Sequence, residues 1–132
     1  MDLGPNLVVL MGDNVYGDCN ETTCSSLREA YDEWESHPSF RGAKSVLPVV
    51  ATLDDHDYGL SDCHVNNPYK DVAKEMFVDF FDIPDRNHKD GVYGAYEWGP
   101  IGQRLQLILL DTRYARSAFL ETDEPIAPGK GV

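Results

Sequence analysis

The sequence is short of basic side chains. Its 132 residues contain 11 Lys and Arg against 23 Asp and Glu, which gives a formal net charge of -12. Such an acidic surface repels the phosphates of nucleic acids, so we expect no direct DNA- or RNA-binding surface. Bound divalent cations would relieve the repulsion among the carboxylates.

Long apolar runs are also missing. No stretch approaches the ~18 consecutive apolar residues of a membrane-spanning helix. The N-terminus lacks a basic segment followed by an apolar core, so we predict neither a membrane span nor an export signal in this chain. Apolar residues still make up 42% of the sequence. This fraction is enough for one globular domain with a single core.

Cysteine is rare, and the three cysteines are an odd number. Cys19 and Cys24 are close enough in sequence to close a small disulfide loop in an oxidising compartment, and three unpaired thiols are the alternative. Asn20 begins an Asn-Glu-Thr triplet of the N-glycosylation type. Together these features favour a secreted or lumenal setting.

Hydrophobic periodicity predicts a strand, a helix and a second strand in the first half of the chain. Short apolar runs over 7–11 and 47–53 are typical of strands buried on both faces. Between them, the helical period predicts a helix that Ser25 or Ser26 caps and that Pro38 stops.

The second half begins with another helix and ends in a hairpin. The helix starts at Asn67 and carries an apolar stripe up to a break at Pro84. Period-two patterns over 92–98 and 104–111 predict an antiparallel hairpin, followed by a Pro/Gly-rich tail. The whole order predicts an α/β fold in which the hairpin extends the first sheet or forms an adjacent layer.

Acidic clusters follow both buried strands. "GDNVYGD" begins at Gly12, and "DDHDYG" begins at Asp54. Loops that leave the carboxyl ends of strands gather at one edge of an α/β sheet. Three carboxylates around His56 repel one another unless a cation is bound. A polar loop with Asx hydrogen bonds explains either cluster alone, but two clusters at two strand ends predict a metal site.

The residue types indicate which metals and which chemistry to expect. The carboxylate of Asp13 suits Ca, Mg or Mn, and a phenolate from Tyr16 suits Fe(III). His56, held near a carboxylate, can act as a general acid or orient a leaving oxygen.

These motifs resemble those of the calcineurin-like metallophosphoesterases. "GDNVYGD" is similar to the second motif of purple acid phosphatases and alkaline phosphatase D-like (PhoD-like) enzymes, and "ATLDDHDYG" to the PhoD-like third motif. "GVYGAYEWGPIGQRLQLILLDTRYAR" resembles the strand that leads into Leu-Asp-Thr-Arg in that family. The resemblance runs from about Leu7 to Arg116. It implies an αββα sandwich-type fold, metal-dependent hydrolysis of phosphate mono- or diesters, a secreted, periplasmic or lumenal location, and a monomer.

The resemblance also implies a role for each motif residue. Asp13 matches the carboxylate that bridges two metal positions, Tyr16 the phenolate ligand of a ferric ion, and Asp55 a further metal ligand. His56 matches the histidine that contacts the phosphate or assists the leaving group, and Asp57 is expected to orient it. Iron(III) and calcium are the expected metals.

Four further residues are expected around these ligands. Asn14 and Asp54 are expected to support the ligands or contact the phosphate. For Asp111 and Arg113 we expect structural pairing near the site, with a phosphate contact by Arg113 as the alternative.

Parts of the family pattern are absent from the sequence. The upstream first motif and the downstream His and Asp motifs are missing, so residues 1–132 are expected to form the central part of the domain. Alone it should bind metal weakly and hydrolyse little. Two alternatives stay open: a non-catalytic acidic module that binds calcium or another metal, and a fragment that folds only with further segments.

Overall fold

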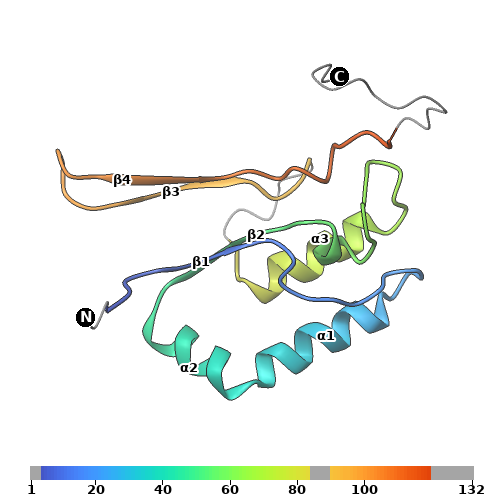
Figure 1. Cartoon of the computed structure of the whole chain (residues 1–132), viewed down its shortest axis with the longest axis horizontal. Helices are drawn as coiled ribbons and strands as arrows, with labels where there is room; N and C mark the ends of the chain where they lie inside the picture. The colour runs from blue at the N-terminus through green and yellow to red at the C-terminus, as the bar shows by residue number, and fades with distance from the viewer. Residues whose placement is uncertain (1–3, 84–89, 120–132) are drawn as a thin grey trace, which may run out of the picture.

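The computed structural model describes residues 4–83 and 90–119, which form a mixed α/β unit (Figure 1). The expected α/β class is confirmed at this level, with three α-helices and two small sheets in the described residues. None of these helices has the length and apolar character needed to cross a membrane. The elements in order are β1 (Val8–Met11), α1 (Ser25–Ser36), α2 (Pro38–Val46), β2 (Val49–Thr52), the 3-10 turn η1 (His56–Tyr58), α3 (Lys70–Phe80), β3 (Gly94–Trp98) and β4 (Leu105–Leu109).

The strands form two separate pairs. β1 and β2 are parallel, and their last residues, Met11 and Thr52, lie opposite each other. β3 and β4 are antiparallel, with Gly94 opposite Leu109. The hairpin is therefore an adjacent layer and does not extend the first sheet. In Figure 1 it runs along one side of the molecule, α1 and α2 run along the other, and β1 and β2 lie between them.

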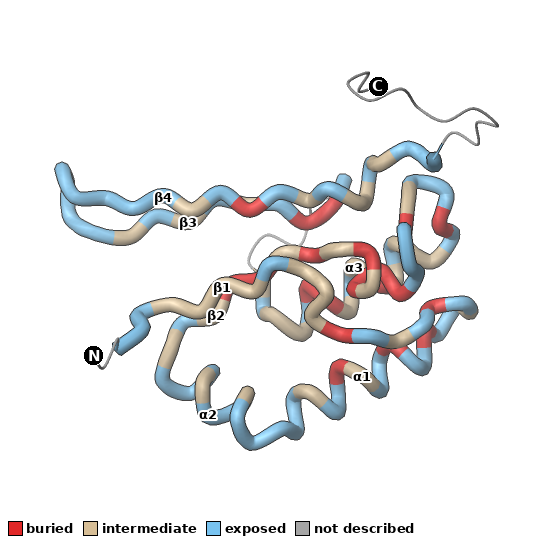
Figure 2. The backbone as a smooth tube through the Cα atoms, viewed as in Figure 1, coloured by how far each residue is buried: buried red, intermediate tan, exposed pale blue. Residues whose placement is uncertain are grey.

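The core lies where α1, α3 and the loops after β1 and β2 meet, and Figure 2 shows most of the buried residues gathered there. Leu27 of α1 and Phe77 of α3 are fully buried. Tyr58, also fully buried, belongs to the turn that carries the second acidic motif. The acidic loops are therefore held on the hydrophobic core of the protein.

A second helix follows Pro38, where we predicted only the end of the first. α1 does end at Ser36, but α2 begins at Pro38 itself. Proline fits a first helical position because its fixed φ suits the helix and its missing N–H would have had no partner there. His37 caps the new helix, and its Nδ1 accepts a hydrogen bond from the backbone N–H of Ser39 at 3.3 Å.

Three predicted boundaries also differ. The helix expected to start at Asn67 begins at Lys70. Cys24 is the N-cap residue of α1 and has no side-chain capping bond, so the prediction of a serine cap is wrong. The carboxylate of Glu21 accepts a hydrogen bond from the backbone N–H of Ser25 at 3.0 Å instead. β2 begins only after Pro48, which has no N–H to donate to a strand ladder. The predicted break at Pro84 and most of the tail lie outside the described residues.

Cys19 and Cys24 form a disulfide with their Cα atoms 4.3 Å apart, which decides between the two cysteine alternatives. Cys63 is a buried free thiol. The backbone N–H of Cys19 donates to the carbonyl of Gly59 at 2.8 Å. The segment between β1 and α1 is thus attached to the turn that follows β2.

Candidate metal centre

The two acidic loops meet at one edge of the parallel pair, as the sequence predicts. The loop after β1 starts with Gly12, whose φ is 104°. A Cβ atom at this position would lie 2.6 Å from the Cβ of Asp54, the first residue after Leu53 in the second loop. Only glycine has both this φ and the room for such a close approach. The contact fixes the distance between the two loops.

Asn14 and Asp57 join the loops by hydrogen bonds. Oδ1 of Asp57 accepts from the backbone N–H and from Nδ2 of Asn14, each at 3.0 Å. Nδ2 of Asn14 also donates to the carbonyl of Thr52 at 2.9 Å, and Oδ2 of Asp57 accepts from the backbone N–H of Asp54 at 2.8 Å. Burial raises the pKa of Asp57 to about 6, although these hydrogen bonds act in the opposite direction.

Asp13, Asp55 and His56 form a group that can hold a metal ion. Each offers one ligand atom, and these atoms lie within 4.8 Å of one another. This spacing is close to what a cation with oxygen distances of about 2.3–2.6 Å needs. The prediction that both acidic loops contribute to one metal site is therefore supported for Asp13 and Asp55, and the group also contains His56, which we expected to contact the phosphate.

The two oxygens of Asp13 differ. Oδ2 accepts a hydrogen bond from the hydroxyl of Tyr16 at 3.3 Å, whereas Oδ1 is buried and has no hydrogen-bond partner. A buried oxygen without a donor is costly. A cation would satisfy it, so the donor set fits a metal ion.

Tyr16 lies beside the group. Its ring contacts the ring of His56 with the centroids 4.4 Å apart, and 66% of the residue is exposed. Desolvation and the neighbouring charge of Asp13 raise the pKa of the Tyr16 phenol. The side chain is therefore protonated near neutral pH in the metal-free protein, and a bound cation would lower its pKa and favour the phenolate.

Asp55 is buried and held in one orientation. Its Oδ2 accepts a hydrogen bond from the backbone N–H of Asp62 at 2.6 Å, and its Oδ1 lies 3.8 Å from Nη2 of Arg113. Burial acts to raise the pKa of Asp55, but the Asp62 amide and the charge of Arg113 outweigh it and leave the pKa below its ordinary value. The carboxylate is therefore charged and ready to bind a cation.

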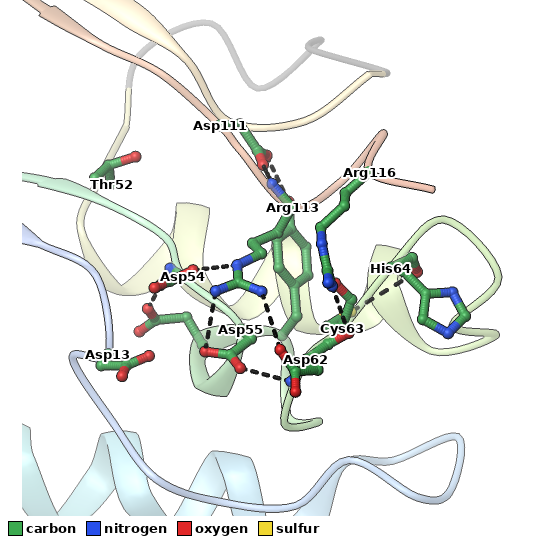
Figure 3. A network of polar contacts seen from close by, with 12 residues as sticks. Asp13, Thr52, Asp54, Asp55, Asp62, Cys63, His64, Asp111, Arg113 and Arg116 are labelled. Carbon is green, nitrogen blue, oxygen red and sulfur yellow. Dashed lines mark hydrogen bonds and ion pairs between the residues drawn. The ribbon is translucent and has the colours of Figure 1, made fainter. Parts of the chain in front are cut away.

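Arg113 enters the site from the segment that follows β4 (Figure 3). Its Nε donates to Oδ1 of Asp54, and its guanidinium also faces Asp55 and Asp62. The expected structural pairing of Arg113 near the site is observed, and its partners are carboxylates. Asp111 does not pair with this guanidinium; its Oδ1 accepts from the backbone N–H of Arg113 at 2.9 Å.

Two residues of this arrangement are not among the predicted site residues. Asp62 binds Asp55 through its backbone, with a φ of 57° that aspartate tolerates better than most residues. The hydroxyl of Tyr58 donates to Oδ2 of Asp111 at 2.6 Å, and burial together with Asp111 raises its pKa. The Ser-Asp pair after Leu60 is a turn signal that points to Asp62, whereas no local pattern pairs Tyr58 with Asp111.

Two of the hollows on the surface are lined by residues at different distances along the chain from the metal group. One of about 280 Å³ is lined by Tyr16, the neighbour of the metal group, together with Trp34, His37 and others. A larger one of about 500 Å³ lies on the hairpin, between Tyr93 and Leu110, and shares no residue with the metal group.

No family model, curated protein or solved structure matches the chain. What the structure establishes is the group Asp13, Asp55 and His56, which can hold a metal ion.

Proposed function

We propose that the chain belongs to a metal-dependent phosphate-ester hydrolase of the alkaline phosphatase D-like kind, and that it forms the central part of a metallophosphoesterase fold. One observation carries the proposal. Ligand atoms of Asp13, Asp55 and His56 converge within 4.8 Å at the carboxyl edge of two parallel strands, and one buried oxygen of Asp13 has no partner. The motifs that supply these residues are the ones that resemble the family.

Asp13 and Asp55 are the proposed metal ligands, with Tyr16 as a third on the exposed side. Phenolate favours iron(III), and the carboxylates accept calcium as well. A bound metal ion would supply positive charge for the phosphoryl oxygens and acidify a water molecule to serve as the nucleophile. The chain's own part is to hold these ligands charged, fixed and close together.

His56 is the proposed proton donor to the leaving oxygen of the ester. Its imidazole belongs to the group that can hold a metal ion, so it would lie near the phosphate of an ester bound to that ion. The predicted role of Asp57 was to orient His56, but in the described residues its carboxylate accepts from Asn14 and Asp54. We therefore propose that Asp57 holds the two acidic loops together and that His56 alone transfers the proton.

The number of donors favours a second candidate, a non-catalytic metal-binding module. The described group offers Asp13, Asp55 and His56, with Tyr16 beside them. A calcium ion takes about six to eight oxygen ligands, so water or substrate would fill several positions. For this reason we expect weak binding and slow turnover from this chain.

Hydrolysis of an aryl phosphate monoester and of a diester, with iron(III), calcium or chelator, tests the proposal. We expect slow hydrolysis that requires metal and is lost in Asp13→Ala, while exposed Asp18→Ala keeps it. Equal rates in chelator, or in Asp13→Ala, would overturn the proposal. Metal binding without hydrolysis would support the non-catalytic module.

A further inference from the structure

Arg113 lies among three carboxylates of the loop after β2, which carries the proposed metal ligand Asp55. Its Nε donates to Asp54, its Nη2 lies 3.8 Å from Oδ1 of Asp55, and its Nη1 lies 3.8 Å from Oδ1 of Asp62. Only 19% of the Arg113 side chain is exposed. Figure 3 shows the guanidinium pointing into this group, with one nitrogen toward each carboxylate.

The side chain of Asp111 fixes the backbone at Arg113. Oδ1 of Asp111 accepts from the backbone N–H groups of Arg113 and Tyr114, each at 2.9 Å. Its Oδ2 accepts from the hydroxyl of Tyr58 and from the backbone N–H of Val92. Asp111 therefore accepts four hydrogen bonds and fixes the backbone from which the Arg113 side chain extends.

The charges around Arg113 explain why a cation is needed there. Asp54, Asp55 and Asp62 each make an ion pair with the one guanidinium of Arg113, and Asp13 lies in the same group as Asp55. Such carboxylates repel one another, which disfavours the charged state of each and the fold of the loop. A planar guanidinium can bind several carboxylates at once.

We propose that Arg113 is the resident counter-cation of the acidic loop after β2, which carries Asp54, Asp55 and Asp62. It balances the charge of Asp54, Asp55 and Asp62 and holds these side chains in place when no metal ion is bound, and it thereby makes the fold of this loop independent of metal. The inference rests on the proposed function, because it assumes that Asp13 and Asp55 bind a cation. It also assigns Arg113 a positioning role and not a phosphate contact, since Nε and both terminal nitrogens already face carboxylates.

The test is thermal unfolding of the chain in chelator and in saturating calcium or manganese. In chelator, Arg113→Gln should lower the Tm by about 5 °C or more, because it leaves partly buried carboxylates without a partner. Metal should restore at least half of this loss, because the ion replaces the missing charge. Arg113→Lys should lie between Arg113→Gln and the unsubstituted chain, since it keeps the charge but loses the planar fork.

Arg116 offers the matched control. Its Nη1 donates to the backbone carbonyls of Asp62 and Cys63, at 2.8 and 3.2 Å, and among residues 4–83 and 90–119 it makes no ion pair with a carboxylate. Arg116→Gln should lower the Tm equally in chelator and in metal. If Arg113→Gln behaves in the same way, the inference is wrong and Arg113 is only a structural tie.

The remaining outcomes separate the inference from the proposed function. If metal stabilises only the Arg113→Gln variant, the counter-cation role is supported and the proposed metal site of the unsubstituted chain is refuted. If metal stabilises neither protein, both ideas fail. Should Arg113→Gln be unfolded in chelator, circular dichroism after metal addition decides: recovery of the folded spectrum supports the inference, and its absence overturns it.

Discussion

Asn14 donates two hydrogen bonds to the same oxygen of Asp57, one from its backbone and one from its side chain, each at 3.0 Å. The two residues are 43 positions apart and belong to different acidic loops. Since Asp13 precedes one of them and Asp55 lies two positions before the other, this pairing sets the distance between the proposed metal ligands.

Asn14→Ala should therefore weaken both the fold and the metal site. It removes the side-chain donor to Asp57 and to the carbonyl of Thr52, which should lower the free energy of unfolding by about 2 kcal/mol. Metal affinity should fall as well, because Asp13 is less firmly held. Chemical denaturation and a metal titration measure the two effects. Asn66→Ala, at an exposed position, is the control and should change neither.

The burial of Asp57 predicts a pH dependence of stability in the metal-free protein. The pKa of Asp57 is about 6 in the folded chain, against about 3.9 for an unfolded aspartate. The folded state thus holds a proton that the unfolded state has released, so the free energy of unfolding falls as the pH rises from about 4 to about 6. The whole loss from this group is roughly 3 kcal/mol.

Urea unfolding in chelator across this pH range is the measurement. The asparagine in Asp57→Asn does not titrate. The free energy of unfolding of this variant should therefore change less between pH about 4 and 6 than that of the unsubstituted chain, even if the variant is less stable at every pH. Bound metal should also flatten the profile, because a nearby cation lowers the pKa of Asp57. The same slope in both proteins would contradict the assignment of this titration to Asp57.

The local sequence pattern predicts much of the site. It also predicts, for a physical reason, that the two acidic loops meet. Two apolar runs, each followed at once by acidic residues, predict parallel strands whose carboxyl ends meet. The pairing of β1 with β2 places Asp13 near Asp55 and His56, as this reasoning requires. No knowledge of the rest of the chain is needed for that step.

Other features depend on tertiary placement and could not be predicted in the same way. Arg113 reaches Asp54 across 59 positions, because the segment after β4 turns back over the loop, and no spacing in the sequence encodes that path. The helix that begins at Pro38 could not be predicted for a different reason. Proline is equally suited to follow one helix and to begin the next, so only the packing decides that α2 exists.

Tyr16 should give a spectroscopic signal if it binds iron(III) as a phenolate. Its phenol is protonated in the metal-free protein, so binding must release a proton and produce a visible charge-transfer absorption. Titration of the chain with iron(III) should show this band, and Tyr16→Phe should abolish it while the hydrogen bond to Asp13 is also lost. Tyr93→Phe, at another exposed tyrosine, should keep the band. A band that survives in Tyr16→Phe would remove Tyr16 from the proposed ligands.

His56 can act as a proton donor or as a metal ligand, and the two roles give opposite results. As a donor, His56→Gln should lower the rate about 10²–10⁴-fold without weakening metal binding. The loss should be larger for an alkyl phosphate than for a nitrophenyl phosphate, because a poor leaving group depends more on protonation. Rates for the two esters, together with a metal titration, provide the measurement. Weaker metal binding with an equal loss for both esters would identify His56 as a ligand, as its position beside Asp13 and Asp55 also allows. His64→Gln is the control, since this imidazole accepts a hydrogen bond from the backbone N–H of Asn66 and lies outside the metal group.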